Sequence, residues 1–250
     1  MSTPATHRQD TSWQTRLISD EQRTRDFIPP GLRMLHDAVA TRARKSHAQA
    51  LLLTGSTARG TRTAISDLDY HLIGEPIVTD DLSGELDLHV VSATLLNTRL
   101  HEGDDFTQWS LRFGCVVFDE GIVRDSVGLI DEQRLWPDPA RKRQQARKSV
   151  GIARAIVASG DHDAAIEQVR TALTLTARWR LLADKRFPLS RAELPTQLEG
   201  LGYVTLATGL ATTIHGLPPM HQLALYVDTA SALLDRKPGS IEGSTRSHAA

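Results

Sequence analysis

The sequence predicts an α+β protein in which a region of strands and helices is followed by a domain built only of helices. The first half of the 250 residues contains short apolar or alternating segments, typical of strands, between segments with helical spacing. A composition break follows at Trp136-Pro137-Asp138-Pro139, where two prolines interrupt the pattern. Beyond it the apolar residues recur at helical spacing, as in Ile166, Val169, Leu173 and Ala177.

The elements of the first half can be placed in chain order. Pro29-Pro30 opens a helix that carries Leu32, Leu35 and Val39 on one face. The residues from Val78 to Ser83 are expected to form the turn between the second and third strands. Strands are expected near residues 49–54, 67–73, 84–92 and 113–118, and helices near 93–101 and 104–111.

This pattern predicts the domain organisation. We expect flexible polar tails at 1–20 and 238–250, a first domain over 21–135 and a helical domain over 139–237. In the helical domain, Ser190 and Glu193 have the spacing of a capping box, and Trp179 is expected in the core.

Bulk properties exclude several classes of protein. A net charge of −1 argues against an extended nucleic-acid platform. A single cysteine, Cys115, excludes an internal disulfide framework and is expected to be a packed, inert thiol. No apolar run is long enough to span a membrane, and residues 1–15 lack the apolar core of a secretory signal. These features predict a cytoplasmic protein that does not associate with membranes.

The most informative feature is a pair of carboxylates downstream of a small-residue turn. Asp67 and Asp69 follow Ser56 after ten intervening residues and share one face of an extended segment, because side chains alternate along a strand. Two adjacent carboxylates raise each other's pKa unless a cation neutralises them. Oxygen ligands select Mg²⁺ or Mn²⁺. The spacing therefore predicts metal-dependent nucleotidyl transfer.

The upstream turn would supply the phosphate contacts. Residues 49–54 form an apolar run that ends at Gly55, which lets the backbone approach a ligand closely. Ser56 offers a backbone N–H and a hydroxyl at the start of a short helix, whose free N–H groups suit a phosphate. Arg59 and Arg62 lie close enough in sequence to bind phosphate oxygens.

Gly55-Ser56 followed by Asp67-Leu68-Asp69 resembles the signature of the DNA polymerase β-like nucleotidyltransferase superfamily, which includes aminoglycoside-modifying and minimal nucleotidyltransferases. The resemblance covers residues 30 to 125. It implies a small mixed β-sheet flanked by helices and a third carboxylate on a neighbouring strand. Asp87 is the best match for that carboxylate, and Glu85 is the second choice.

The resemblance implies an enzyme that transfers a nucleoside monophosphate, with AMP from ATP expected, to a hydroxyl and releases pyrophosphate. Two Mg²⁺ ions, with Mn²⁺ as the alternative, would be held by Asp67, Asp69 and Asp87. Asp87 would also accept the proton, with Glu85 and Glu120 as alternatives. The expected acceptor is a small molecule such as an aminoglycoside-like antibiotic or a metabolite. The alternatives are a toxin that modifies tRNA or protein, and a non-catalytic antitoxin-like partner; the oligomeric state is left open.

Other residues allow both a functional and a structural interpretation. His71 and His89 lie on the same faces as Asp69 and Asp87 and could contact a metal or a phosphate. Asp119-Glu120 could orient the acceptor, although a solvated strand end is the simpler interpretation. The basic cluster of Arg141, Lys142, Arg143, Arg147 and Lys148 could bind RNA or the triphosphate, or form a solvated helix face.

Overall fold

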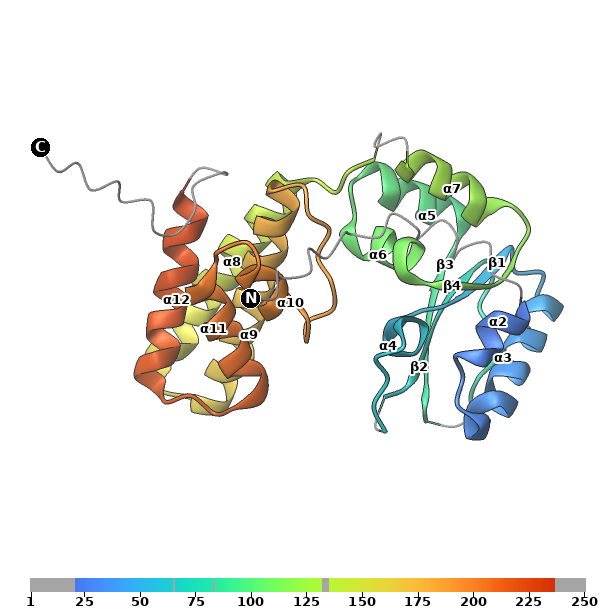
Figure 1. Ribbon diagram of the computed structural model, residues 1–250, viewed down its shortest axis with the longest axis horizontal. Coiled ribbons are helices and arrows are strands. Elements are labelled where there is room, and N and C mark those ends of the chain that lie inside the picture. The colour runs from blue at the N-terminus through green and yellow to red at the C-terminus, as the bar shows by residue number, and fades with distance from the viewer. Residues whose placement is uncertain (1–20, 65, 83, 132–134, 237–250) are drawn as a thin grey trace, which may run out of the picture. The chain divides into compact units, whose positions relative to one another are not determined.

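A computed structural model describes residues 21–64, 66–82, 84–131 and 135–236 (Figure 1). The chain divides between Pro137 and Asp138 into two compact units, unit 1 (Met1–Pro137) and unit 2 (Asp138–Ala250), each described by itself below. The predicted tails at 1–20 and 238–250 lie outside the described residues. No helix within the described ranges combines the length and apolar character that a membrane crossing requires.

In the described part of unit 1, four strands form one mixed sheet in the order β3-β2-β1-β4. β1 is antiparallel to both of its neighbours, β2 and β4, whereas β2 and β3 run parallel. The mixed sheet confirms the predicted α+β class. The strands are β1 (Ala50–Leu53), β2 (Leu68–Ile73), β3 (Leu86–Val91) and β4 (Cys115–Asp119).

Helices cover both faces of this sheet (Figure 1). One face packs Leu68, Tyr70 and Leu72 of β2 against α3 (Arg33–Lys45), which contributes Val39 and Ala43. The opposite face packs apolar residues of all four strands against α5 (Ala93–His101), α6 (Asp105–Phe113) and α7 (Ile122–Asp131). Because side chains alternate along β2, Asp69 and His71 belong to the face covered by α5 to α7.

The amino-terminal helices differ in part from the expectation. The chain forms α2 (Glu21–Asp26) and then a short 3₁₀ turn, η1 (Pro30–Leu32), before α3 begins at Arg33. Pro30 thus opens the 3₁₀ turn rather than the helix itself. α7 is also a helix that the sequence pattern did not indicate.

All the regular secondary structure in the described part of unit 2 is helical, which confirms the second half of the predicted fold class. Gly160 follows α8 (Pro139–Ser159) as its C-cap, with the positive φ of +81° that glycine favours, and Asp161 then caps α9 (His162–Ala183). Trp179 is buried in the core, as expected. The helices are α8 (Pro139–Ser159), α9 (His162–Ala183), α10 (Leu194–Glu199), α11 (Val204–His215) and α12 (Met220–Asp235).

The predicted capping box at Ser190 is wrong. α10 begins only at Leu194, and its N-cap residue is Glu193. The Ser190 hydroxyl donates to the Glu193 carboxylate, and the Ser190 carbonyl accepts the N–H groups of Glu193 and Leu194. The two side chains therefore bond to each other within the turn, instead of capping the backbone N–H groups of a helix.

Candidate functional site

The turn after β1 folds closely against a carboxylate. Thr54 is extended, and a short helix, α4 (Gly55–Arg59), follows and ends at Gly60. Gly55 has a φ of +64°, and a Cβ atom added there would lie 1.8 Å from Oδ2 of Asp69. Only a residue without a side chain allows this approach. The turn predicted to bind phosphate and the central carboxylate are therefore neighbours in space.

Backbone contacts hold Asp69 at the end of β1. The Thr54 N–H donates to the Asp69 carbonyl over 2.8 Å, and the Thr54 hydroxyl donates to the same oxygen over 3.3 Å. On the other side, Asp69 lies directly opposite Asp87 in the parallel register of β2 and β3. The sheet thus places these two carboxylates side by side on adjacent strands.

Among the three predicted carboxylates, Asp69 is influenced by the other two. Asp69 is half-buried, whereas Asp67, just before β2, and Asp87 are exposed. Burial raises the pKa of Asp69, and the negative charges of Asp87 and Asp67 raise it further. Glu85 does not contribute to this shift, and its backbone carbonyl pairs with the Leu68 N–H. Asp87 thus lies opposite Asp69 in the sheet, and its role as the third carboxylate of a site stays a prediction.

The chemistry of this donor set fits a divalent cation. Mutual repulsion between carboxylates is relieved when a positive ion lies between them, and carboxylate oxygens suit Mg²⁺ and Mn²⁺. Among the described residues, however, no group of three or more His, Cys, Asp or Glu side chains is arranged to hold a metal ion. The carboxylates are neighbours without converging on one point, and two of the three are exposed enough to change rotamer.

The two arginines near the turn have different surroundings. Arg59, the last residue of α4, places its guanidinium carbon 5.4 Å from the ring centre of Phe113 and 5.9 Å from that of Trp109, both on α6. Arg62 donates to the carbonyls of Thr63 and Ser66 over 3.0 and 2.7 Å. Arg62 therefore braces the loop that leads to Asp67, a structural role that the sequence pattern did not indicate.

Beyond the carboxylates lies a pair of histidines. His71 and His89 are opposite each other in the β2–β3 register, with ring centres 4.8 Å apart. His71 is 1% exposed, and neither of its ring nitrogens has a hydrogen-bond partner among the described residues. Desolvation, with smaller effects from His89 and Arg99, lowers the pKa of His71 to about 3. His71 is therefore a neutral core residue at neutral pH.

His89 is held from α5 and α6. Arg99 donates to Nε2 of His89 over 3.1 Å, and the ring of Phe106 meets the His89 ring edge to face at 5.3 Å. Desolvation first, and then the charge of Arg99, lower the pKa of His89. The sequence analysis missed Arg99, Phe106, Trp109 and Phe113, because nothing in the spacing of these residues indicates that α5 and α6 cover the carboxylate face.

Asp119 and Glu120 lie at the other end of the sheet. Ala50 pairs with Asp119 and Leu53 with Cys115, whereas the turn and Asp69 follow the Leu53 end of β1. The Asp119 carboxylate accepts the N–H groups of Gly121, Val123 and Arg124 and so caps α7. These positions do not support the suggested acceptor-orienting role, nor Glu120 as an alternative proton acceptor.

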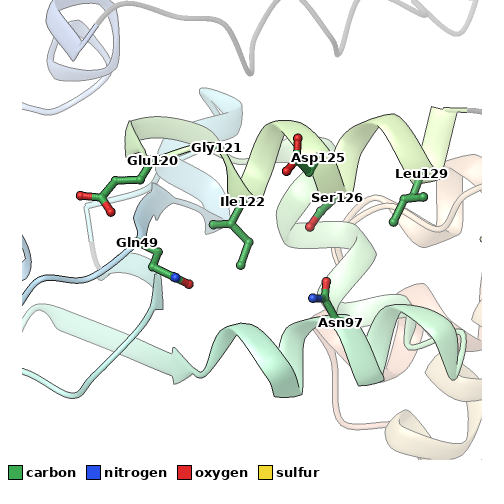
Figure 2. Close-up of a pocket in the computed structure, with 8 residues that line it drawn as sticks. All are labelled: Gln49, Asn97, Glu120, Gly121, Ile122, Asp125, Ser126 and Leu129. Carbon is green, nitrogen blue, oxygen red and sulfur yellow. The ribbon is translucent and has the colours of Figure 1, made fainter.

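A cavity of about 450 Å³ lies at this second end of the sheet (Figure 2). Figure 2 shows Gln49, Asn97 and Ile122 pointing into it, whereas the Glu120 carboxylate points away. Of the residues that line it, only Glu120 was a candidate site residue in the sequence analysis, as an alternative proton acceptor. The lining does not include Asp67, Asp69, Asp87 or the turn at Gly55.

The basic cluster of α8 is largely engaged within unit 2. Arg143 donates through Nε and Nη2 to the carbonyl of Leu234, and Arg147 reaches both that carbonyl and the Asp235 carboxylate. These cations satisfy the last turn of α12, where backbone carbonyls have no helical partner. The structural interpretation of the cluster is thus the better one for these two arginines.

Comparison with known proteins adds little to this geometry. No protein-family model and no curated protein matches the sequence. The chain is similar to a solved structure, a nucleotidyltransferase-like protein from Exiguobacterium sibiricum 255-15, at 17% identity and a TM-score of 0.42, over 81% of this chain and 73% of the other. A likeness of this size carries no argument about activity, so function rests on the site itself.

Proposed function

We propose that unit 1 is a metal-dependent nucleotidyltransferase, which moves a nucleoside monophosphate from a nucleoside triphosphate to a hydroxyl group. The observation that carries this proposal is the close approach of Gly55 to Asp69, with Asp87 in register beside it. This arrangement offers a site for a triphosphate next to a site for cations. Nucleotidyl transfer requires both of these sites side by side.

The carboxylates would bind the cations. Asp67, Asp69 and Asp87 would hold two Mg²⁺ ions, with Mn²⁺ as the alternative. Bound divalent ions neutralise triphosphate charge and lower the pKa of an attacking hydroxyl. Burial and then the negative charges of Asp87 and Asp67 raise the pKa of Asp69, and a cation between these carboxylates would relieve the effect of the charges, which supports this role.

The turn would bind the triphosphate. The Ser56 hydroxyl and the backbone N–H groups around it would donate to phosphate oxygens, and Gly55 would keep that backbone close to Asp69. Arg59 would add a charged donor. These groups position the substrate and stabilise charge, which is how phosphoryl-transfer enzymes achieve most of their catalysis.

The transfer itself would be an in-line displacement. The acceptor hydroxyl oxygen forms a bond to the α-phosphorus while the bond from that phosphorus to the bridging oxygen breaks. The electron pair of the broken bond leaves with pyrophosphate. The hydroxyl proton passes to Asp87, which is exposed and therefore reachable by an acceptor.

For the acceptor we propose a small hydroxylated molecule, such as an aminoglycoside-like antibiotic or a metabolite, with ATP as donor. A net charge of −1 supports this choice over RNA. The contacts of Arg143 and Arg147 within unit 2 support it further, since they reduce the charge available to a polyanion.

The test is transfer of label from α-³²P nucleoside triphosphates, with Mg²⁺, to an antibiotic panel or to cell extract. Label on a small molecule supports the full proposal. Label on RNA or protein would support nucleotidyl transfer but show that the acceptor is a macromolecule. Asp69→Asn should abolish transfer. Asp125→Asn, the same change on α7, should not. Absence of nucleotide binding by the wild type would refute the proposal and leave the antitoxin-like alternative.

A further inference from the structure

Two aromatic side chains of α6 lie against the arginine beside the turn. Trp109 and Phe113 are four residues apart and so lie on the same face of the helix. Their ring centres are 5.7 Å apart, with an angle of 54° between the planes. The Arg59 guanidinium lies within cation–π distance of both rings. This trio is called the aromatic cradle below.

Both ends of α6, the helix that carries Trp109 and Phe113, have defined contacts. At its start, α6 is capped by Asp104, whose carboxylate accepts the Thr107 N–H over 2.7 Å. At its end, a Cβ atom added to Gly114 would lie 2.5 Å from the Ser110 carbonyl oxygen and 3.2 Å from that of Leu53. The end of α6 therefore abuts the end of β1, directly before the turn that carries Arg59.

This placement has a consequence for ligand binding. A free arginine loses rotamer freedom when it binds a phosphate, and that loss lowers affinity. A guanidinium already packed against two rings has lost part of this freedom beforehand, and it keeps its positive charge. Trp109, Phe113 and Arg59 are each partly exposed, although Nη1 of Arg59 and Nε1 of Trp109 are buried.

We infer that Trp109 and Phe113 are positioning residues for the triphosphate, which hold Arg59 in the orientation that contacts the β- or γ-phosphate. The inference rests on the proposed nucleotidyl transfer and assigns to unit 1 a determinant of selectivity for triphosphates. The simpler alternative is that both rings only fill space between α4 and α6. The two cases differ in which ligands a substitution affects.

The test is calorimetric titration with Mg²⁺ and two probes, a non-hydrolysable α,β-methylene triphosphate and the corresponding monophosphate. Trp109→Leu and Phe113→Leu should each weaken the triphosphate analogue by roughly 3- to 10-fold, within the range of a cation–π contact. The monophosphate should change by less than about twofold. Trp109→Phe keeps a π-face and should restore most of the affinity.

A matched control exists on the opposite face of the sheet. Arg44 lies 4.9 Å from the ring centre of Phe118, a contact of the same class away from the turn. Phe118→Leu should leave both affinities unchanged. In an Arg59→Gln background, Trp109→Leu and Phe113→Leu should cause no further loss, because the group that they position is gone. In turnover assays the KM for the triphosphate should rise while kcat stays nearly constant.

Equal weakening of both probes, or losses that add to that of Arg59→Gln, would show that the rings only support the fold and would overturn the inference. If Trp109→Leu fails to fold, Phe113→Leu and its cycle with Arg59→Gln decide the question. If the wild type binds the triphosphate analogue and the Trp109 and Phe113 variants bind it equally well, the positioning role is refuted and the proposed function stands. If the wild type binds no triphosphate, the positioning role and the proposed function are refuted together.

Discussion

Gly55 combines two separate requirements at one residue. Its φ of +64° lies in the left-handed region, and its missing side chain makes room for the Asp69 carboxylate. Gly60, five residues later, has the similar φ of +72°, but a Cβ atom there would meet nothing within 4 Å. Substitutions at these two glycines therefore distinguish the free-energy cost of a positive φ from the cost of a clash with Asp69.

Gly55→Ala should accordingly damage the protein more than Gly60→Ala. Both place alanine in the left-handed region, at a cost of about 1–2 kcal/mol in the free energy of unfolding. Only Gly55→Ala also forces Asp69 to move, which should weaken triphosphate binding by at least about 10-fold. Urea unfolding and nucleotide titration measure the two effects. Equal losses in both variants would show that the contact with Asp69 is unimportant.

Asp69→Asn should raise stability in the absence of metal. The pKa of Asp69 is raised above its ordinary value of 3.8, so between the two values the folded state binds more protons than the unfolded chain. Wild-type stability therefore falls as the pH rises through this window, and the loss persists at neutral pH. Asp69→Asn has no carboxyl group at this position and does not lose stability in this window. Its higher free energy of unfolding at pH 7, relative to wild type, should therefore vanish as the pH approaches 3.8.

Chelator-containing unfolding experiments from about pH 3.5 to 7 check this prediction, with Asp125→Asn as the control. Turnover of Asp69→Asn with Mg²⁺ should fall by at least about 100-fold. A variant that is less stable than wild type at pH 7 would mean that the Asp69 carboxylate has a stabilising partner, and would count against a cation site.

At the scale of elements, the ends of helices account for two residues that attract a functional interpretation. Asp119 caps α7, and Arg143 binds the last turn of α12. Charged residues gather at such ends because the backbone groups there have no helical partner. A charged residue near a strand end or in a basic run therefore needs its structural neighbours before a catalytic role is assigned.

Asp119→Ala should lower the stability of unit 1 by about 1 kcal/mol, the usual cost of a lost N-cap. Asp119→Asn retains one acceptor oxygen and should lose less. Nucleotide binding should stay unchanged in both, because α7 begins at the end of the sheet opposite to Asp69. Chemical unfolding and nucleotide titration of the same samples give the answer. A loss of turnover without a loss of stability would instead indicate that Asp119 acts in catalysis.

At the scale of the whole molecule, the balance of charge bears on the acceptor. The chain carries 29 basic and 30 acidic residues, so no overall excess attracts a polyanion. Two arginines of the densest basic run bind within unit 2 instead. Of that run, Lys148 is exposed and offers a charge that can be removed without disturbing those contacts.

The KM for the acceptor should therefore depend weakly on salt. Between 50 and 200 mM KCl we expect a change of less than about threefold, whereas an acceptor held by six to ten phosphate contacts would lose roughly 10³- to 10⁵-fold in affinity. Lys148→Gln should leave the acceptor KM unaltered. A steep salt dependence that becomes weaker in Lys148→Gln would indicate that the acceptor is a nucleic acid rather than a small molecule.

The sequence by itself determined the fold class and the position of each strand to within about two residues. Alternation along a strand, the break at the prolines and the helical spacing of the second half are local patterns, so they can be seen without knowledge of the fold. Gly55 and the Asp67/Asp69 pair could be identified as candidate site residues for the same reason, because their spacing is a local feature of the sequence. Local patterns failed where a turn and a helix compete, as at Ser190 and Pro30.

Only the tertiary structure decided which distant residues meet. It placed Asp87 opposite Asp69 through the parallel pairing of β2 and β3, and it brought Trp109 and Phe113 to Arg59. It also moved Asp119 away from the site. Strand register and helix packing join segments tens of residues apart, and they depend on burying a shared apolar surface. No spacing within a single segment records that choice.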